Sequence, residues 1–176
     1  MNSKNKNNIT KLVLSGLLAA FVTVATVLIA IPTPTKGYIN LGDSFVNISA
    51  WLLGPIYGAA AAGIGSALAD LFLGYTLYAP VTFVIKALMA VASFFVFKAL
   101  SKHTHGFFAR IMAAIVAEVI MVLGYFAFEC ILYGFAGSII GVPANLIQGV
   151  GGVVIAVVLY DALLGHIPFF KNLNDL

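Results

Sequence analysis

Long runs without a charged side chain dominate this chain. Residues 12–35, 44–69 and 130–160 contain no Asp, Glu, Lys or Arg, and these runs are 24, 26 and 31 residues long. A helix rises about 1.5 Å per residue, so that about 20 apolar residues cross a hydrocarbon core of about 30 Å. The pattern therefore predicts helices that span a membrane.

Proline and glycine divide these runs into separate helices. The segment Ile-Pro-Thr-Pro-Thr ends the first helix, because proline lacks an amide donor and restricts the residue before it. Gly54-Pro55 breaks the second run into a short and a longer helix. The sequence predicts an all-α integral membrane bundle of six transmembrane helices, one of them short, in a single membrane domain without an extramembrane domain. The helices are expected at about residues 10–31, 45–53, 56–73, 79–100, 107–133 and 144–164, with a connector rich in small residues at 134–143.

The composition supports a membrane protein. Charged residues make up 9% of the chain and hydrophobic residues 62%, with a mean hydropathy of +1.08, whereas soluble domains carry about 25% charged residues. The net charge of +3 is not gathered in a basic stripe or arm, which argues against nucleic acid as a partner. A single cysteine excludes an internal disulfide. The apolar run after the basic N-terminus is too long for a signal peptide, so it is taken as the first span.

The positive charges predict the orientation in the membrane. With six helices both termini lie on one side, and that side would carry seven of the nine bases: Lys4, Lys6, Lys11, Lys98, Lys102, Arg110 and Lys171. Because positive charge concentrates in cytoplasmic loops, both termini are expected inside the cell. The connections at 32–44, 74–78 and 134–143 would then face outward.

Polar residues within or next to the spans converge on the outer half of the bundle. An ionisable group inside a membrane costs roughly 2.5–3.5 kcal/mol on insertion scales and needs a partner or a function. Lys86 lies about two turns inside its helix, where Asp70 or Glu129 could pair with it; a purely structural pair with Asp70 is one alternative. Tyrosines also occur in the aromatic belts of membrane proteins. Apolar and aromatic walls with a few polar groups are typical of a small-molecule pocket. The candidate substrate-binding residues are Tyr38, Asn40, Asp43, Asp70, Tyr78, Lys86, Tyr125, Glu129, Asn145 and Gln148.

The motifs of enzymes and of ATP-driven machines are missing. The sequence has no HExxH or Walker motif and no Ser or Cys nucleophile beside a base, and the GVGG at 149–152 lacks the context of a nucleotide loop. A metal site at His103 and His105 is conceivable, but solvated loop histidines fit that interfacial position better. We therefore expect no catalytic residue, no metal and no cofactor. An inverted repeat of the usual secondary-transporter size is also missing, so that uphill transport would need other subunits.

The first helix carries small residues at one-turn spacing. Ser15 and Ala19, and Gly16 and Ala20, form two overlapping small-xxx-small pairs. Such pairs let helices approach closely in lipid, where no hydrophobic drive brings them together. The pairs serve either packing within the bundle or contact with another subunit.

Four segments resemble the substrate-specific (S) components of energy-coupling factor (ECF) vitamin transporters. They are IPTPTKGYINLGDSFV at 31–46, WLLGPIYGAAAAGIGSALADLFLGY at 51–75, APVTFVIKALMA at 79–90 and VPANLIQG at 142–149. The resemblance implies a membrane protein of the prokaryotic cell membrane that captures a small vitamin outside the cell. A transmembrane coupling subunit and two ATPase subunits would drive its import. Gly16 and Ala20 resemble the motif that docks on the coupling subunit, with glycine in place of the usual first alanine.

The resemblance also suggests a substrate class. The segments INLGD and PANLIQG are most similar to S components associated with pyridoxine or hydroxymethylpyrimidine. No cluster of bases is available for a carboxylate-rich or phosphorylated ligand, which argues against folate. Riboflavin, a queuosine precursor and other heterocycles remain alternatives, as do a stand-alone secondary transporter or channel and a purely structural membrane subunit.

Overall fold

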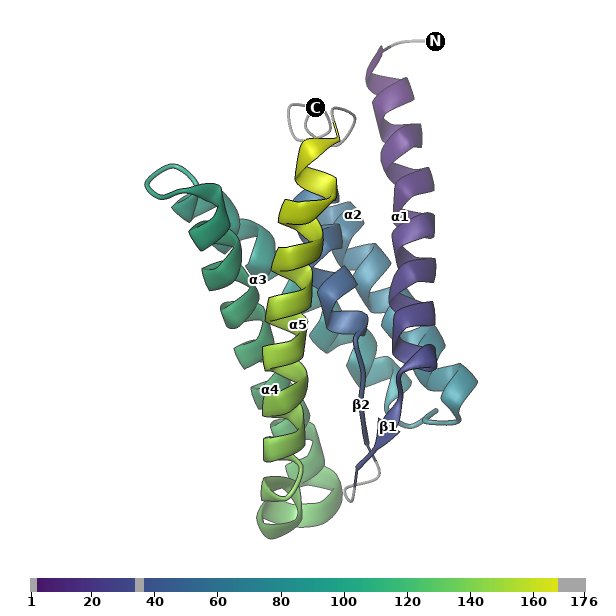
Figure 1. Ribbon diagram of the computed structural model, residues 1–176. Coiled ribbons are helices and arrows are strands. Elements are labelled where there is room, and N and C mark those ends of the chain that lie inside the picture. The colour runs from purple at the N-terminus through teal and green to yellow at the C-terminus, as the bar shows by residue number, and fades with distance from the viewer. Residues whose placement is uncertain (1–2, 34–36, 168–176) are drawn as a thin grey trace.

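The computed structural model describes residues 3–33 and 37–167 and is built almost entirely of helices (Figure 1). The described part has five helices long and apolar enough to cross a membrane. The elements are α1 (Ser3–Leu28), β1 (Ile31–Pro32), β2 (Tyr38–Ile39), α2 (Gly42–Leu73), α3 (Ala79–Leu100), α4 (Gly106–Ile139), α5 (Val142–Ala162) and the 3-10 turn Leu164–His166. The predicted all-α membrane bundle is thus confirmed, with five long helices in place of six.

The difference in helix number lies in α2, which bends sharply at Gly54. This residue has φ +80° and ψ −174°, a left-handed conformation that side chains other than hydrogen disfavour. Pro55 follows and restarts the helix. The bend brings the second segment back against the first, so that the hydroxyl of Ser49 donates to the carbonyl of Gly58 at 3.3 Å. The predicted break therefore divides α2 into segments 42–53 and 55–73.

Two corrections concern helix boundaries. The first segment of α2 begins at Gly42, three residues before the predicted start, and this places Asp43 in its first turn. The connector predicted at 134–143 is largely helical, because α4 resumes after a break at Gly134 (φ +72°) and continues to Ile139. Two contacts join this last part of α4 to the rest of the helix: the ring of Phe135 lies 5.8 Å from that of Phe126, and the buried Ser138 hydroxyl lies 3.0 Å from Sγ of Cys130.

The bundle has two distinct ends. The antiparallel hairpin β1–β2, which pairs Ile31 with Ile39, and the connection from α4 to α5 lie together at what we term the hairpin end (Figure 1). Helix α1 begins and α5 ends at the opposite end, the terminal end, where α3 also turns into α4. Residues 34–36 and Lys171 lie outside the described residues, and the side chains of Lys4 and Lys6 are likewise not described.

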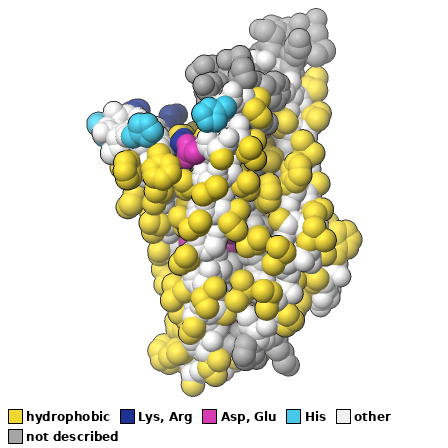
Figure 2. Space-filling model, viewed as in Figure 1, with side chains coloured by type: hydrophobic (Ala, Val, Ile, Leu, Met, Phe, Trp, Pro, Cys, Tyr) yellow, Lys and Arg dark blue, Asp and Glu magenta, His cyan; other side chains and the backbone are white. Residues whose placement is uncertain are grey.

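Segment 42–53 forms the centre of the bundle. Its side chains are almost completely buried: Val46, Ala50 and Trp51 are at most 1% exposed. Hydrophobic side chains cover the flanks of the molecule, and histidine, Lys and Arg side chains gather at the terminal end (Figure 2). This arrangement places apolar surface toward lipid and leaves the central segment to carry buried polar groups.

Candidate binding site

A narrow cavity opens at the hairpin end, between the hairpin and all five long helices. Its free volume is about 40 Å³, which is room for a few water molecules. Nine of the ten candidate residues line it, and Asp43 lies behind the wall. The lining residues are Thr26, Gly37, Tyr38, Asn40, Ser66, Asp70, Tyr75, Tyr78, Thr82, Lys86, Tyr125, Glu129, Asn145 and Gln148.

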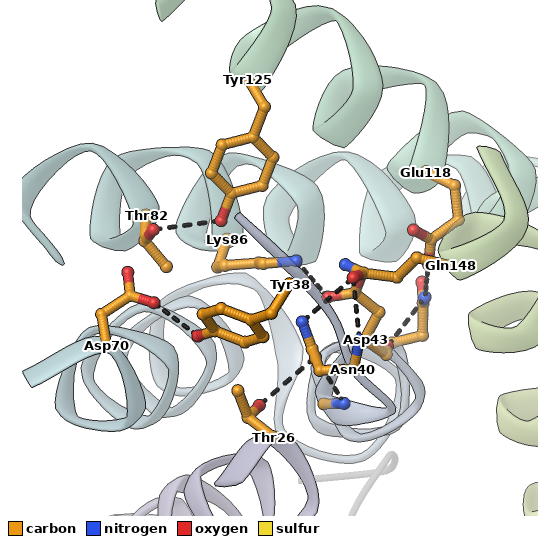
Figure 3. A network of polar contacts seen from close by, with 12 residues as sticks. Thr26, Tyr38, Asn40, Asp43, Asp70, Thr82, Lys86, Glu118, Tyr125 and Gln148 are labelled. Atoms are coloured by element: carbon orange, nitrogen blue, oxygen red, sulfur yellow. Dashed lines mark hydrogen bonds and ion pairs between the residues drawn. The ribbon is translucent and has the colours of Figure 1, made fainter. Parts of the chain in front are cut away.

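Lys86 pairs with Asp43, and this corrects both partners considered from the sequence. Its ammonium forms an ion pair with the carboxylate of Asp43, whereas neither Asp70 nor Glu129 pairs with it. Lys86 is 3% exposed and Asp43 is fully buried. The other oxygen of Asp43 accepts a hydrogen bond from Nε2 of Gln148 at 2.7 Å. Lys86 also lies 5.5 Å from the centroid of the Tyr125 ring (Figure 3).

Hydrogen bonds of Asn40 connect the end of the hairpin to the helices. Its backbone N–H and its side-chain amide both donate to Oε1 of Gln148, at 3.0 and 3.1 Å. Its own Oδ1 accepts from the backbone N–H of Gly42 at 2.8 Å and from the hydroxyl of Thr26 at 3.4 Å. Asn40 thus connects the hairpin with α1, α2 and α5, and fixes the floor of the cavity.

Tyr38 extends from β2 across the cavity toward α2 (Figure 3). Its hydroxyl donates to Oδ1 of Asp70, and its ring packs on Tyr75 at 4.9 Å between centroids. Burial raises the pKa of the Tyr38 phenol well above its ordinary value, and the negative charge of Asp70 adds to this effect. The phenol is therefore a neutral hydrogen-bond donor that occupies part of the space a substrate would need.

Sequence reasoning missed four residues with hydroxyl groups on the wall. Ser66 precedes Asp70 by one helical turn, and Thr82 precedes Lys86 by the same interval. The hydroxyl of Tyr125 donates to Thr82 at 3.1 Å. Ser66 and Thr82 could have been found from the sequence, because each lies four residues before a predicted site residue and therefore on the same helix face. Thr26 gave no comparable signal, because its place on the wall depends on how the hairpin folds. Tyr75 lies in the connection between α2 and α3, at the same outer level as the candidate Tyr78, and was not selected with it.

Comparison with known proteins identifies the family. A family model described as "ECF-type riboflavin transporter, S component" matches residues 6–164. The chain belongs to the S-component family of ECF-type transporters. A Pyrococcus woesei protein, described as an uncharacterized protein in gap 3'region, is 37% identical over 135 residues, which cover 76% of this chain and 88% of that protein.

The same architecture is found in a solved structure. The chain described as "Structure and mechanism of the S component of a bacterial ECF transporter" matches with a TM-score of 0.65 and 21% identity, over 93% of this chain and 98% of that one. At this level of identity the match supports the fold. S components are multi-pass membrane proteins of the plasma membrane. They belong to a family of transport proteins and not of enzymes. In general they act on small molecules together with a transmembrane subunit and ATPases.

A second polar cluster of this S component continues from Asp43 toward the terminal end. Asn47, one turn after Asp43, donates to Oε1 of Glu118 at 3.2 Å and accepts from the hydroxyl of Ser93 at 2.8 Å. That hydroxyl in turn accepts from the indole N–H of Trp51 at 3.0 Å. The side chain of Asn47 therefore links α2, α3 and α4 in the middle of the bundle, which explains its complete burial.

The two small-xxx-small pairs of α1 face different surroundings. The hydroxyl of Ser15 bonds the carbonyl of Tyr57, and Ala19 lies against Gly65, where an added Cβ would come within 2.5 Å of the Ala19 carbonyl. Gly16 and Ala20 are exposed, and a Cβ added at Gly16 would meet nothing within 4 Å. The first pair therefore packs within the subunit, and the second lies open on the surface of α1.

Proposed function

We propose that this chain is the high-affinity substrate-binding subunit of an ECF-type transporter, which captures a vitamin or vitamin precursor from outside the cell for ATP-driven import by its partner subunits. The cavity that opens at the hairpin end carries this proposal. It combines tyrosine rings with amide, hydroxyl and charged groups, as small-molecule sites do. The chain lacks an ATP-binding motif of its own, so that other subunits must supply the energy.

Pyridoxine or hydroxymethylpyrimidine is the substrate that we favour. Both are small single rings, and the free volume of about 40 Å³ leaves little room unless Tyr38 moves aside. Riboflavin, to which the name of the matching family refers, is the main alternative. Its three fused rings and sugar chain need a far larger displacement of the cavity wall than a single ring does. A queuosine precursor or another heterocycle is a further alternative within the same function.

The proposed orientation places the hairpin end outside and both termini in the cytoplasm. Lys11, Lys98, Lys102 and Arg110 lie toward the terminal end, where positive charge is expected inside. We further propose that the open pair on α1, Gly16 and Ala20, docks on the transmembrane coupling subunit, which acts with two ATPase subunits. Gly16 is exposed, and a Cβ added there would meet nothing within 4 Å in the described part of the chain. This supports the role, since close helix approach needs an uncovered small residue.

Transport by reconstituted vesicles tests the function. Liposomes with this chain, the coupling subunit and both ATPases, loaded with ATP, should accumulate radiolabelled pyridoxine or hydroxymethylpyrimidine. Liposomes with this chain alone should bind the compound but not accumulate it under a proton or sodium gradient. Gradient-driven accumulation by the chain alone would instead show a secondary transporter and overturn the proposal.

A further inference from the structure

Two carboxylates on the cavity wall have unused hydrogen-bonding capacity. Asp70 and Glu129 are 3% and 4% exposed, and both line the cavity. Oδ2 of Asp70 and Oε2 of Glu129 are buried without a hydrogen-bond partner among the described residues. Thr82 lies near Asp70 in Figure 3, and its hydroxyl accepts from that of Tyr125 at 3.1 Å. Because buried polar groups are nearly always satisfied in native proteins, each unpaired oxygen is open to a hydrogen-bond donor in the cavity.

Lys86 forms no ion pair with Asp70 or Glu129. Lys86 is the one base among the described residues that line the cavity, and its charge is met by Asp43 behind the wall. Tyr38 donates one hydrogen bond to Asp70 at its other oxygen. The wall thus offers two buried carboxyl groups with open acceptor atoms and, among the described residues, no positive group without a partner, which disfavours an anionic ligand.

Aromatic rings surround the same space. Tyr75 lies between Tyr38 and Tyr78, with ring centroids 4.9 and 6.4 Å away. Tyr125, on the opposite helix α4, already accommodates the ammonium of Lys86 at 5.5 Å from its centroid. Faces of aromatic rings attract cations, and more strongly where water is excluded. Rings and carboxylates together form a site suited to a flat, positively charged group.

We infer that the substrate is bound as a cation, as a protonated nitrogen heterocycle of the pyridinium or aminopyrimidinium class, whose N–H edge faces Asp70 and Glu129. This inference rests on the proposed function and specifies its ligand further. The N–H groups of such a ring satisfy the unpaired oxygens, and its face stacks between the tyrosines. A neutral tricyclic ring can also stack and donate an N–H, but it brings no charge to the two acids.

Matched ligand pairs test the inference. The purified protein in detergent is titrated with pyridoxine and with hydroxymethylpyrimidine, each beside a carbocyclic analogue in which C–H replaces the ring nitrogens, and with riboflavin. At least one basic ring should bind more tightly than its neutral analogue by about tenfold or more, the effect expected of a desolvated cation at aromatic rings and carboxylates. The double variant Asp70→Asn/Glu129→Gln should reduce that ratio to near one. Asp161→Asn, the same kind of change at the terminal end, should leave it unaltered.

The possible results separate the inference from the function. Equal affinity for a basic ring and its neutral analogue, or a ratio unchanged in the double variant, overturns the cationic ligand and leaves the binding subunit intact. Saturable binding of riboflavin alone has the same meaning. If the folded protein binds none of these compounds, the favoured substrates and riboflavin are excluded, and the inference fails with them.

Discussion

Loss of the Lys86 ammonium should destabilise the folded protein strongly. In Lys86→Met the carboxylate of Asp43 stays fully buried and loses its charged partner, while the hydrogen bond from Gln148 at 2.7 Å remains. Removing one partner of a buried ion pair costs about 3–5 kcal/mol, because the remaining charge is uncompensated. With about 2–4 °C per kcal/mol for a chain of this size, the melting temperature should fall by about 6–20 °C. Thermal unfolding in detergent, followed by circular dichroism, measures this shift.

Two further variants decide whether the pair is the cause. Lys86→Met/Asp43→Asn removes both charges and keeps an oxygen that accepts from Gln148, so that it should regain most of the lost stability. Lys98→Met makes the same substitution at an exposed position of the same helix and should change stability by less than about 0.5 kcal/mol. A Lys86→Met protein as stable as the Lys98→Met control would refute the reasoning, as would a double variant no more stable than the single one.

Three other substitutions test separate parts of the structure. Gly16→Leu should abolish ATP-driven uptake by the complete transporter without changing the ligand Kd, because a Cβ added at this exposed position meets nothing within 4 Å among the described residues. Gly151→Leu, at a half-buried position of α5 where an added Cβ likewise meets nothing within 4 Å, should preserve uptake, and uptake preserved in both would disprove docking at Gly16. Gly65→Leu should lower the free energy of unfolding by about 1–3 kcal/mol or more, because its Cβ would approach the α1 backbone to 2.5 Å; unchanged denaturant unfolding would contradict the helix contact. Tyr38→Phe keeps the ring but leaves Asp70 without its donor, and should destabilise the ligand-free protein by about 1.5–3 kcal/mol in a thermal melt; a wild-type melt would exclude this hydrogen bond.

The spans and their breaks were predictable from sequence because lipid imposes them directly. Charge-free runs long enough to cross a bilayer identify the helices, and Gly54-Pro55 indicates the bend whatever the rest of the fold does. The helix after Gly134 was not predictable in this way, because its contacts reach back across the break, from Phe135 to Phe126 and from the buried Ser138 to Cys130. Local signals therefore gave the helices, and contacts decided where two of them begin and end.

The cavity was predictable as a set of residues but not as a set of contacts. Depth in the membrane brought nine of the ten candidate residues to one cavity, since polar groups in a bundle avoid lipid. Depth alone left Asp70 and Glu129 as equally good partners for Lys86. The true partner, Asp43, was assigned to a loop because the helix start was set three residues late. Pairing in the interior depends on which helix occupies the centre of the bundle, and a single sequence does not contain that information.

Equilibrium binding to the purified S component, without its partner subunits, tests the proposed function most directly. Isothermal titration with pyridoxine, hydroxymethylpyrimidine and riboflavin should give saturable binding of one of them with one site per chain. Asn145→Ala, which removes an amide from the cavity wall, should weaken that binding and leave the thermal unfolding curve unchanged. A correctly folded wild-type protein that binds none of the three compounds, or an Asn145→Ala variant that binds as the wild type does, would contradict a substrate site in this cavity.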